Sequence, residues 1–288
     1  LRGNKPVFDF KADVRHLQLD RLNIFGLTSP YALRTVIDSR LVGDKIDDMA
    51  GTVHLTNTDL LVEQKLYHLS DVQLSAGNLE DGRRKLDFNS DILDADFTGR
   101  FELVALPAAF REIIPRYLPN VMLPVKGEAG RQEFDFNIYL KNTSVITENF
   151  LPELYFDPAT RLHGTINAAN KTFDLRFEAP DIRYRSMRWL TVDSRFTAAG
   201  KSMEVELSAD TVYYSNQGYI PDLRFTASAA DNTASFGLRL SDDEGAENRL
   251  NWHGHADFAS VREFQISIDT SRILIGRNEW QFAERNSV

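Results

Sequence analysis

The sequence predicts an all-β protein: an elongated, curled antiparallel sheet (a β-groove, or β-taco) with an apolar interior and one or two short amphipathic helices. Apolar and polar residues alternate with a period of two along most of the chain, which places one set of side chains on one face of each strand. Turn residues interrupt the alternation about every ten residues, which is typical of an antiparallel meander. Phe and Tyr, which favour strands, number 19 and 9.

The composition excludes several classes of function. The 288 residues carry a formal net charge of −9, so the chain lacks the basic surface of a nucleic-acid-binding protein. It has no cysteine, which excludes disulfides, thiolate metal sites and thiol nucleophiles. The sequence contains no stretch of about twenty apolar residues, so it predicts no membrane-spanning helix. No signal peptide is visible. Because the sequence opens close to a strand pattern, we expect an internal fragment of a longer chain.

Residues 1–141 are expected to form a first β-groove segment. Asp81-Gly82 is the strongest signal for a hairpin turn in this segment. The alternation changes phase at Ile92–Leu93, which predicts a bulge or break where the sheet bends. The alternating stretches that predict strands are 8–14, 31–41, 51–55, 60–76 (two or three strands), 86–92, 93–103 and 134–140.

A helical stripe interrupts the strand pattern near residues 105–118. Phe110, Ile113, Ile114 and Tyr117 recur at positions i, i+3, i+4 and i+7, the spacing of one helix face. Pro119 would end such a helix. We expect this helix to cover the apolar face of the sheet at one place.

Residues 142–158 are expected to form a linker with a possible short helix over 144–151, ended by Pro152. Residues 159–288 are expected to form a second β-groove segment, continuous with the first. This segment contains the longest alternating series in the chain, and turn pairs such as Asn170-Lys171 and Asp231-Asn232 divide it into short strands.

One-faced strands leave a large apolar surface that has to be covered. Two such faces pack together in a sandwich, a barrel closes on itself, and one very long sheet curls into a trough. The alternation alone favours the sandwich core, whereas a trough would be a groove for acyl chains, because each buried CH2 is worth about 0.8 kcal/mol. The residues predicted to line the groove are Phe97, Phe101, Phe134, Phe136, Ile138, Ile166, Phe173, Leu175, Phe177, Val205, Leu207, Phe225, Phe236, Leu238, Trp252 and Ile266.

Two stretches resemble the TamB branch of the AsmA-like proteins, especially the versions from Bacteroidota-type bacteria. The first is DFNSDILDADFTGRFELVALPAAFREIIPRYLP, in which a strand pair runs into a short helix that ends Tyr-Leu-Pro at residues 117–119. The second is the tail from NRLNWHGHADF to SRILIGRNEWQFAERNSV. The likeness touches residues 50–119 and 161–285, and its motif positions are Ser90, Asp91, Ala95, Phe97, Gly99, Phe101, Ser271 and Trp280.

The resemblance implies a periplasmic segment of an inner-membrane-anchored cell-envelope protein. Such proteins carry phospholipids along a hydrophobic groove from the inner to the outer membrane, assist outer-membrane protein assembly, or do both. The implied partners are phospholipid acyl chains and an Omp85-type outer-membrane protein. The Omp85 contact and the inner-membrane anchor would lie outside this fragment. The resemblance shifts our preference from the sandwich to the groove. The alternative is a non-catalytic β-sandwich or β-solenoid, a structural or adhesion module whose apolar face is only core.

Candidate catalytic and metal-binding groups are few. His253 and His255 share a strand face, but no third ligand is apparent, so we interpret them as surface histidines. The acidic run 242–245 lacks the ligand spread of a calcium loop and is interpreted as a turn. Asp91, Asp94, Asp96 and Glu102 alternate with apolar residues, as expected for a solvated strand face rather than a glycosidase pair. We therefore expect no enzyme activity, no metal and no cofactor.

Overall fold

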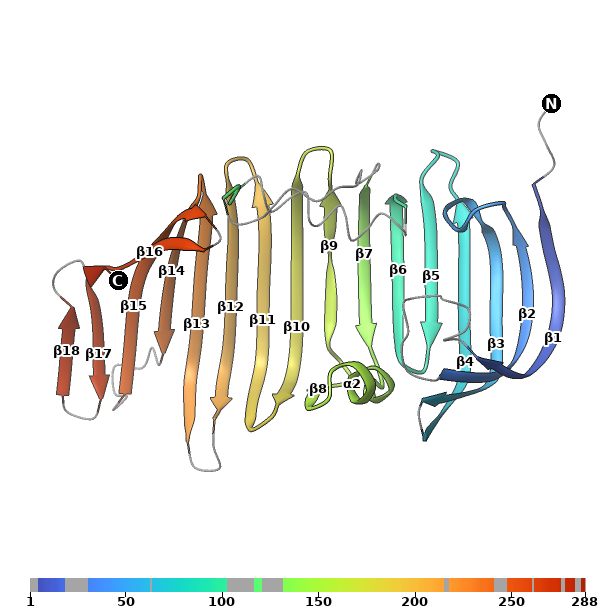
Figure 1. The fold of residues 1–288 in the computed structure, drawn as a ribbon, viewed down its shortest axis with the longest axis horizontal. Helices are drawn as coiled ribbons and strands as arrows, with labels where there is room; N and C mark the ends of the chain where they lie inside the picture. The colour runs from blue at the N-terminus through green and yellow to red at the C-terminus, as the bar shows by residue number, and fades with distance from the viewer. Residues whose placement is uncertain are drawn as a thin grey trace.

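The structure is a computed structural model that describes residues 5–18, 31–62, 64–102, 117–120, 132–214, 218–240, 248–260, 262–275, 278–282 and 286–287. The described chain is almost entirely strand and forms one antiparallel sheet that is not closed. Figure 1 shows the strands side by side along the long axis of the molecule, from β1 at one end to β18 at the other. This architecture confirms the predicted fold class, an elongated all-β sheet.

The strands before the linker pair in chain order. They are β1 (Val7–Gln18), β2 (Tyr31–Val42), β3 (Ala50–Val62), β4 (Lys65–Asn78), β5 (Arg84–Ser90), β6 (Leu93–Arg100) and β7 (Glu133–Leu140), with the 3-10 helix η2 (Ile46–Asp48) before β3.

The sheet continues across the linker, because β7 pairs directly with β9. Helix α2 (Ser144–Phe150) is present where a short helix was predicted. The elements after α2 are β8 (Leu154–Phe156), β9 (Arg161–Asn167), β10 (Thr172–Tyr184), β11 (Met187–Ala199), β12 (Ser202–Tyr213), β13 (Tyr219–Ala230), β14 (Thr233–Leu240), β15 (Asn248–Ser260), β16 (Glu263–Ile268), β17 (Ser271–Ile275), β18 (Asn278–Phe282) and β19 (Asn286–Ser287).

The predicted turns can be checked individually. Asp81-Gly82 joins β4 and β5, and Gly82 adopts a left-handed φ of 77° and donates its N–H to the Leu79 carbonyl. The phase change at Ile92–Leu93 is a turn between two strands rather than a bulge within one. There the Ser90 hydroxyl oxygen accepts hydrogen bonds from the N–H groups of Ile92 and Leu93, each at 3.1 Å.

Most of the predicted covering helix lies outside the described residues, including Phe110, Ile113 and Ile114. The acidic run 242–245, which was interpreted as a turn, also lies outside them. Tyr117 is described; it lies in a turn and is only 1% exposed.

The register places an apolar row and a polar row on opposite faces of the sheet. Directly paired residues on neighbouring antiparallel strands point to the same face. One such row, from β1 to β15, is Phe10, Ser39, Val53, Leu74, Phe88, Ala95, Ile138, Leu162, Phe177, Ser194, Leu207, Phe225, Leu238 and Trp252. The adjacent row on the other face is Asp9, Arg40, Thr52, Ser75, Asp87, Asp96, Asn137, His163, Arg176, Arg195, Glu206, Thr226, Gly237 and His253.

An aromatic cluster forms the middle of the apolar face. Phe97, Phe101, Phe134 and Phe136 place neighbouring ring centroids 5.6–6.1 Å apart, a favourable range for tilted and stacked ring pairs. Gly99 makes this arrangement possible, because a Cβ at that position would lie 2.2 Å from the Glu133 carbonyl oxygen. The backbones of β6 and β7 lie too close together at Gly99 to leave room for the side chain of any other residue type.

A line of irregular pairs crosses the long strands β10–β13. The pairing between β10 and β11 skips Pro180 and Thr191, and Thr191 has a left-handed φ of 51°. Proline has no N–H for the ladder, so an interruption at this position is expected. The alternation resumes out of phase beyond it, so Ile182 and Trp189 return to the apolar face, where they line the same hollow as Phe177.

Candidate functional site: an apolar hollow on the sheet

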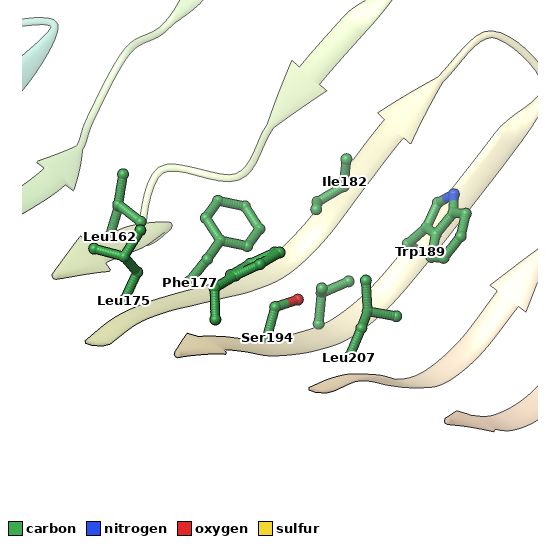
Figure 2. Close-up of a pocket in the computed structure, with 9 residues that line it drawn as sticks. Leu162, Leu175, Phe177, Ile182, Trp189, Ser194 and Leu207 are labelled. Carbon is green, nitrogen blue, oxygen red and sulfur yellow. The ribbon is translucent and has the colours of Figure 1, made fainter. Parts of the chain in front are cut away.

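The apolar face is hollowed over strands β9–β12. The hollow has a volume of about 510 Å³, within the range of small-molecule sites. Figure 2 shows its labelled side chains standing on one side of these strands. The lining consists of Leu162 from β9, Leu175, Phe177 and Ile182 from β10, Trp189, Val192, Ser194 and Phe196 from β11, and Leu207 from β12. Ser194 is the single polar residue in this lining.

The hollow exists because a small side chain lies between large ones. Ser194 is paired directly with Phe177 on one side and with Leu207 on the other. Its side chain is shorter than both and only 2% exposed. Ile182 and Trp189, brought to this face by the irregular pairs, extend the lining toward one end of the strands. The arrangement has the size and polarity of a hydrocarbon-binding site and contains no pair of groups suited to acid–base chemistry.

A strap at residues 117–120 covers the apolar face beside the hollow. Tyr117 belongs to the buried cluster that contains Phe101, Phe134 and Ile166, and its hydroxyl donates to the Lys171 carbonyl at 3.2 Å. The strap is also fastened at its other end. There the Asn120 side-chain N–H donates to the Phe258 carbonyl at 2.8 Å, and the backbone N–H of Asn120 donates to Asn232 Oδ1 at 2.7 Å.

Helix α2 covers another part of the apolar face. Val145 packs into a buried cluster with Tyr31, Val62, Tyr67 and Leu69. Glu148 forms an ion pair with Lys65, and it also accepts a hydrogen bond from the Tyr67 hydroxyl at 3.0 Å. The strap and α2 therefore close two parts of the face, while the hollow stays open.

Ion pairs reinforce the opposite face behind the hollow. Arg195 Nη2 lies 2.6 Å from a carboxylate oxygen of Asp174, and Arg176 Nη2 lies 2.5 Å from one of Asp193. The hydrogen bond from Arg195 holds the pKa of Asp174 below its ordinary value. These ion pairs are partly exposed, so each contributes little to the free energy of unfolding. They keep this face of the sheet charged and solvated.

Asp181 is the most buried charge of this region. Burial opposes its ionisation, but hydrogen bonds from Arg188 and Arg183 outweigh the burial and hold the pKa of Asp181 below its ordinary value. Its carboxylate oxygens accept from both guanidinium groups at 2.7–3.0 Å. The cluster lies next to the irregular pairs and fixes the strand ends that carry Ile182 and Trp189.

Every residue predicted to line a groove is described, and none is exposed. Leu175, Phe177 and Leu207 line the hollow. Phe97, Phe101, Phe134, Phe136, Ile138, Ile166 and Phe173 belong to the central cluster beneath the strap. Val205, Phe225, Phe236, Leu238, Trp252 and Ile266 continue the same face across β12–β16.

Several lining residues were not singled out by the sequence. Leu162, Val192 and Phe196 follow the alternation and could have been included. Ile182 and Trp189 lie beyond the phase change at Pro180 and Thr191, so the alternation that identifies Phe177 does not extend to them. Ser194 reads as polar in sequence, yet it lies within the apolar row.

The other candidate groups lie away from the hollow. His255 is less exposed than expected, because its side chain is only 14% exposed and lies between Asp257 and Asp269. Among the described residues, no cluster of three or more His, Asp or Glu side chains could hold a metal ion. Asp94 pairs with Lys141 and Asp96 accepts from Asn137, both on the charged face. Asp91 accepts hydrogen bonds from the N–H groups of Ser70 and Asp71.

Comparisons of the chain with family models, curated proteins and solved structures found no match. Within the described residues, no helix combines the length and the apolar composition needed to cross a membrane.

Proposed function

We propose that this chain is a groove segment that carries phospholipids along its apolar face, in the periplasm, as part of an inner-membrane-anchored envelope protein. The observation that supports this proposal best is the open apolar hollow over β9–β12, which lies in a row of like-facing side chains running from β1 to β15. A structural module needs no open hydrocarbon surface of this kind, because such a surface costs solubility.

The energy available to an acyl chain is large enough for binding. At about 0.8 kcal/mol per CH2, a 16-carbon tail removed from water gains around 10 kcal/mol. Immobilising the lipid offsets much of this gain. The net free energy of binding is therefore small enough for the lipid to dissociate again, as a carrier requires. Side-chain rows that cross the strands offer neighbouring positions of similar polarity, so a tail encounters no charged barrier along the row.

The resemblance to TamB-type proteins adds the proposed direction and partners. Transport would run between the inner and outer membranes, and an Omp85-type protein would be reached through other parts of the full-length chain. Assistance to outer-membrane protein assembly is proposed on the same basis. The chemistry proposed for this chain is binding without catalysis.

Native mass spectrometry of the purified chain tests the proposal. We expect adducts with the mass of phospholipids, and we expect Ser194→Phe to reduce them because the new ring fills the hollow. Ser228→Phe is the matched control, since Ser228 is exposed on the opposite face. A chain that stays free of lipid after incubation with phosphatidylglycerol would favour the structural β-module instead.

A further inference from the structure

A second hollow lies beside η2, the start of β5 and the end of β6. It has a volume of about 280 Å³ and is lined by Lys45, Asp47, Asp48, Gly82, Arg84, Arg100, Phe101 and Glu102. Its polar lining distinguishes it from the hollow over β9–β12. It is separated from that hollow by the central aromatic cluster of β6 and β7.

Arg84 places a guanidinium on the apolar face. Arg84 is paired directly with Gly99, in a row that continues to Phe134 and Ile166. Its Nη2 donates to the Met49 carbonyl at 3.1 Å. Its Cζ lies 5.6 Å from the centroid of the Phe101 ring, within cation–π range.

The remaining terminal nitrogen of Arg84 has no acceptor. Nη1 is buried, and no described residue accepts a hydrogen bond from it. A buried charged donor without a partner is costly, and such a group in a folded protein calls for an acceptor that is missing. The planar guanidinium matches oxyanions, above all phosphate and carboxylate.

Three carboxylates line the hollow, those of Asp47, Asp48 and Glu102, and none of them accepts a hydrogen bond from Nη1. Asp48 is taken up by Lys5 at 3.0 Å and by the backbone N–H groups of Asp44 and Lys45. Arg100 borders the hollow, but it pairs with Glu133 on the opposite face from Arg84, and its guanidinium lies 3.7 Å from the Glu133 carboxylate there.

We propose that this hollow binds a phosphate group, with Arg84 as its principal ligand and Lys45 as a further cation. The phosphate could come from a lipid headgroup or from free phosphate, because the recognition chemistry is the same. The volume accommodates a headgroup and no acyl chains, so tails of a lipid bound here would extend over Phe101. The site stands on Arg84 and its surroundings, independently of whether the hollow over β9–β12 takes lipid.

Binding of two probes tests the site: inorganic phosphate by calorimetry, and phosphatidylglycerol vesicles by flotation. Vesicles of a phosphate-free diglucosyl diacylglycerol are the lipid control and should not bind. Arg84→Met removes the guanidinium and keeps much of the side-chain volume. Arg84→Lys keeps the charge, and Arg83→Gln is the control at an exposed neighbour that pairs with Asp81. We expect phosphate or phosphatidylglycerol binding that falls at least tenfold in Arg84→Met, falls less in Arg84→Lys and is unchanged in Arg83→Gln.

The probes also distinguish the source of the phosphate. Binding of inorganic phosphate supports a free-anion site, and Arg84-dependent flotation with phosphatidylglycerol alone supports a headgroup site. Arg84→Met should unfold at the same or a higher denaturant concentration, because it removes an unpaired buried donor. Wild-type protein that binds neither probe, or Arg84→Met that binds as wild type does, would overturn the proposal. The same holds if Arg84→Met loses stability without losing binding.

Discussion

Ser194 and Phe177 are direct partners across β10 and β11, and the difference in their size opens the hollow on the apolar face. In a packed sheet the position opposite a phenylalanine is commonly filled. Here a hydroxyl-bearing side chain leaves the space empty. Filling it should therefore close the hollow without disturbing the sheet.

Ser194→Leu tests that relationship. The added carbons occupy free volume and remove a buried hydroxyl, so we expect the free energy of unfolding to stay constant or rise by about 1 kcal/mol. Uptake of a fluorescent fatty acid should fall at least fivefold. Ser228→Leu, on the opposite face, should leave uptake unchanged. Equal uptake by both variants would mean that the probe binds elsewhere.

Charges on the two faces should have unequal effects. Phe177→Asp and Leu207→Asp place a carboxylate within the hydrocarbon surface, so we expect both to impair lipid transfer between donor and acceptor vesicles. Glu206→Asp and Arg176→Gln change neighbouring positions on the charged face, where exposed pairs contribute little. These two variants should transfer lipid like the wild type. Similar rates in all four variants would contradict a role for the apolar face.

Gly99→Ala should destabilise the sheet. Gly99 has a φ of 152°, and an added Cβ would lie 2.2 Å from the Glu133 carbonyl oxygen. We expect a loss of about 2 kcal/mol, measured as a shift of the urea midpoint. Gly77→Ala is the control in β4, because a Cβ there would meet nothing within 4 Å. A midpoint that stays constant in Gly99→Ala would show that β6 and β7 can move apart at no cost.

Stability should depend on the ionisation of Asp181. Its pKa is lowered in the folded state, so its contribution is complete above its unfolded pKa, near pH 4, and is lost as the pH falls through the folded value. Asp181→Asn should cost about 2 kcal/mol at pH 7, the order of a buried charged hydrogen bond. The difference from the wild type should shrink below pH 4. Urea unfolding of the wild type and of Asp181→Asn at pH 7 and pH 3 measures the difference in their free energies of unfolding. The same difference at both pH values would assign the loss of stability to packing alone.

The sequence predicted the sheet because period-two alternation is a direct consequence of strand geometry. Phe134, Phe136 and Ile138 could be assigned to one face from their spacing alone. The alternation does not reveal which segments cover a face. It could therefore not predict that Tyr117 and Val145 pack into buried clusters on the apolar face. It also fails wherever the phase changes. Thr191 adopts a left-handed φ that its sequence does not signal, and this hides Ile182 and Trp189 from any count of alternating residues.

Site-specific photocrosslinking tests the central claim most directly. A photoreactive phenylalanine analogue placed at Phe177 faces the hollow, and the same analogue at Arg176 faces the charged side of the same strand. After irradiation in cells with labelled phosphate, the groove account predicts a phospholipid adduct at position 177 and none at position 176. No adduct at either position, or equal adducts at both, would contradict it.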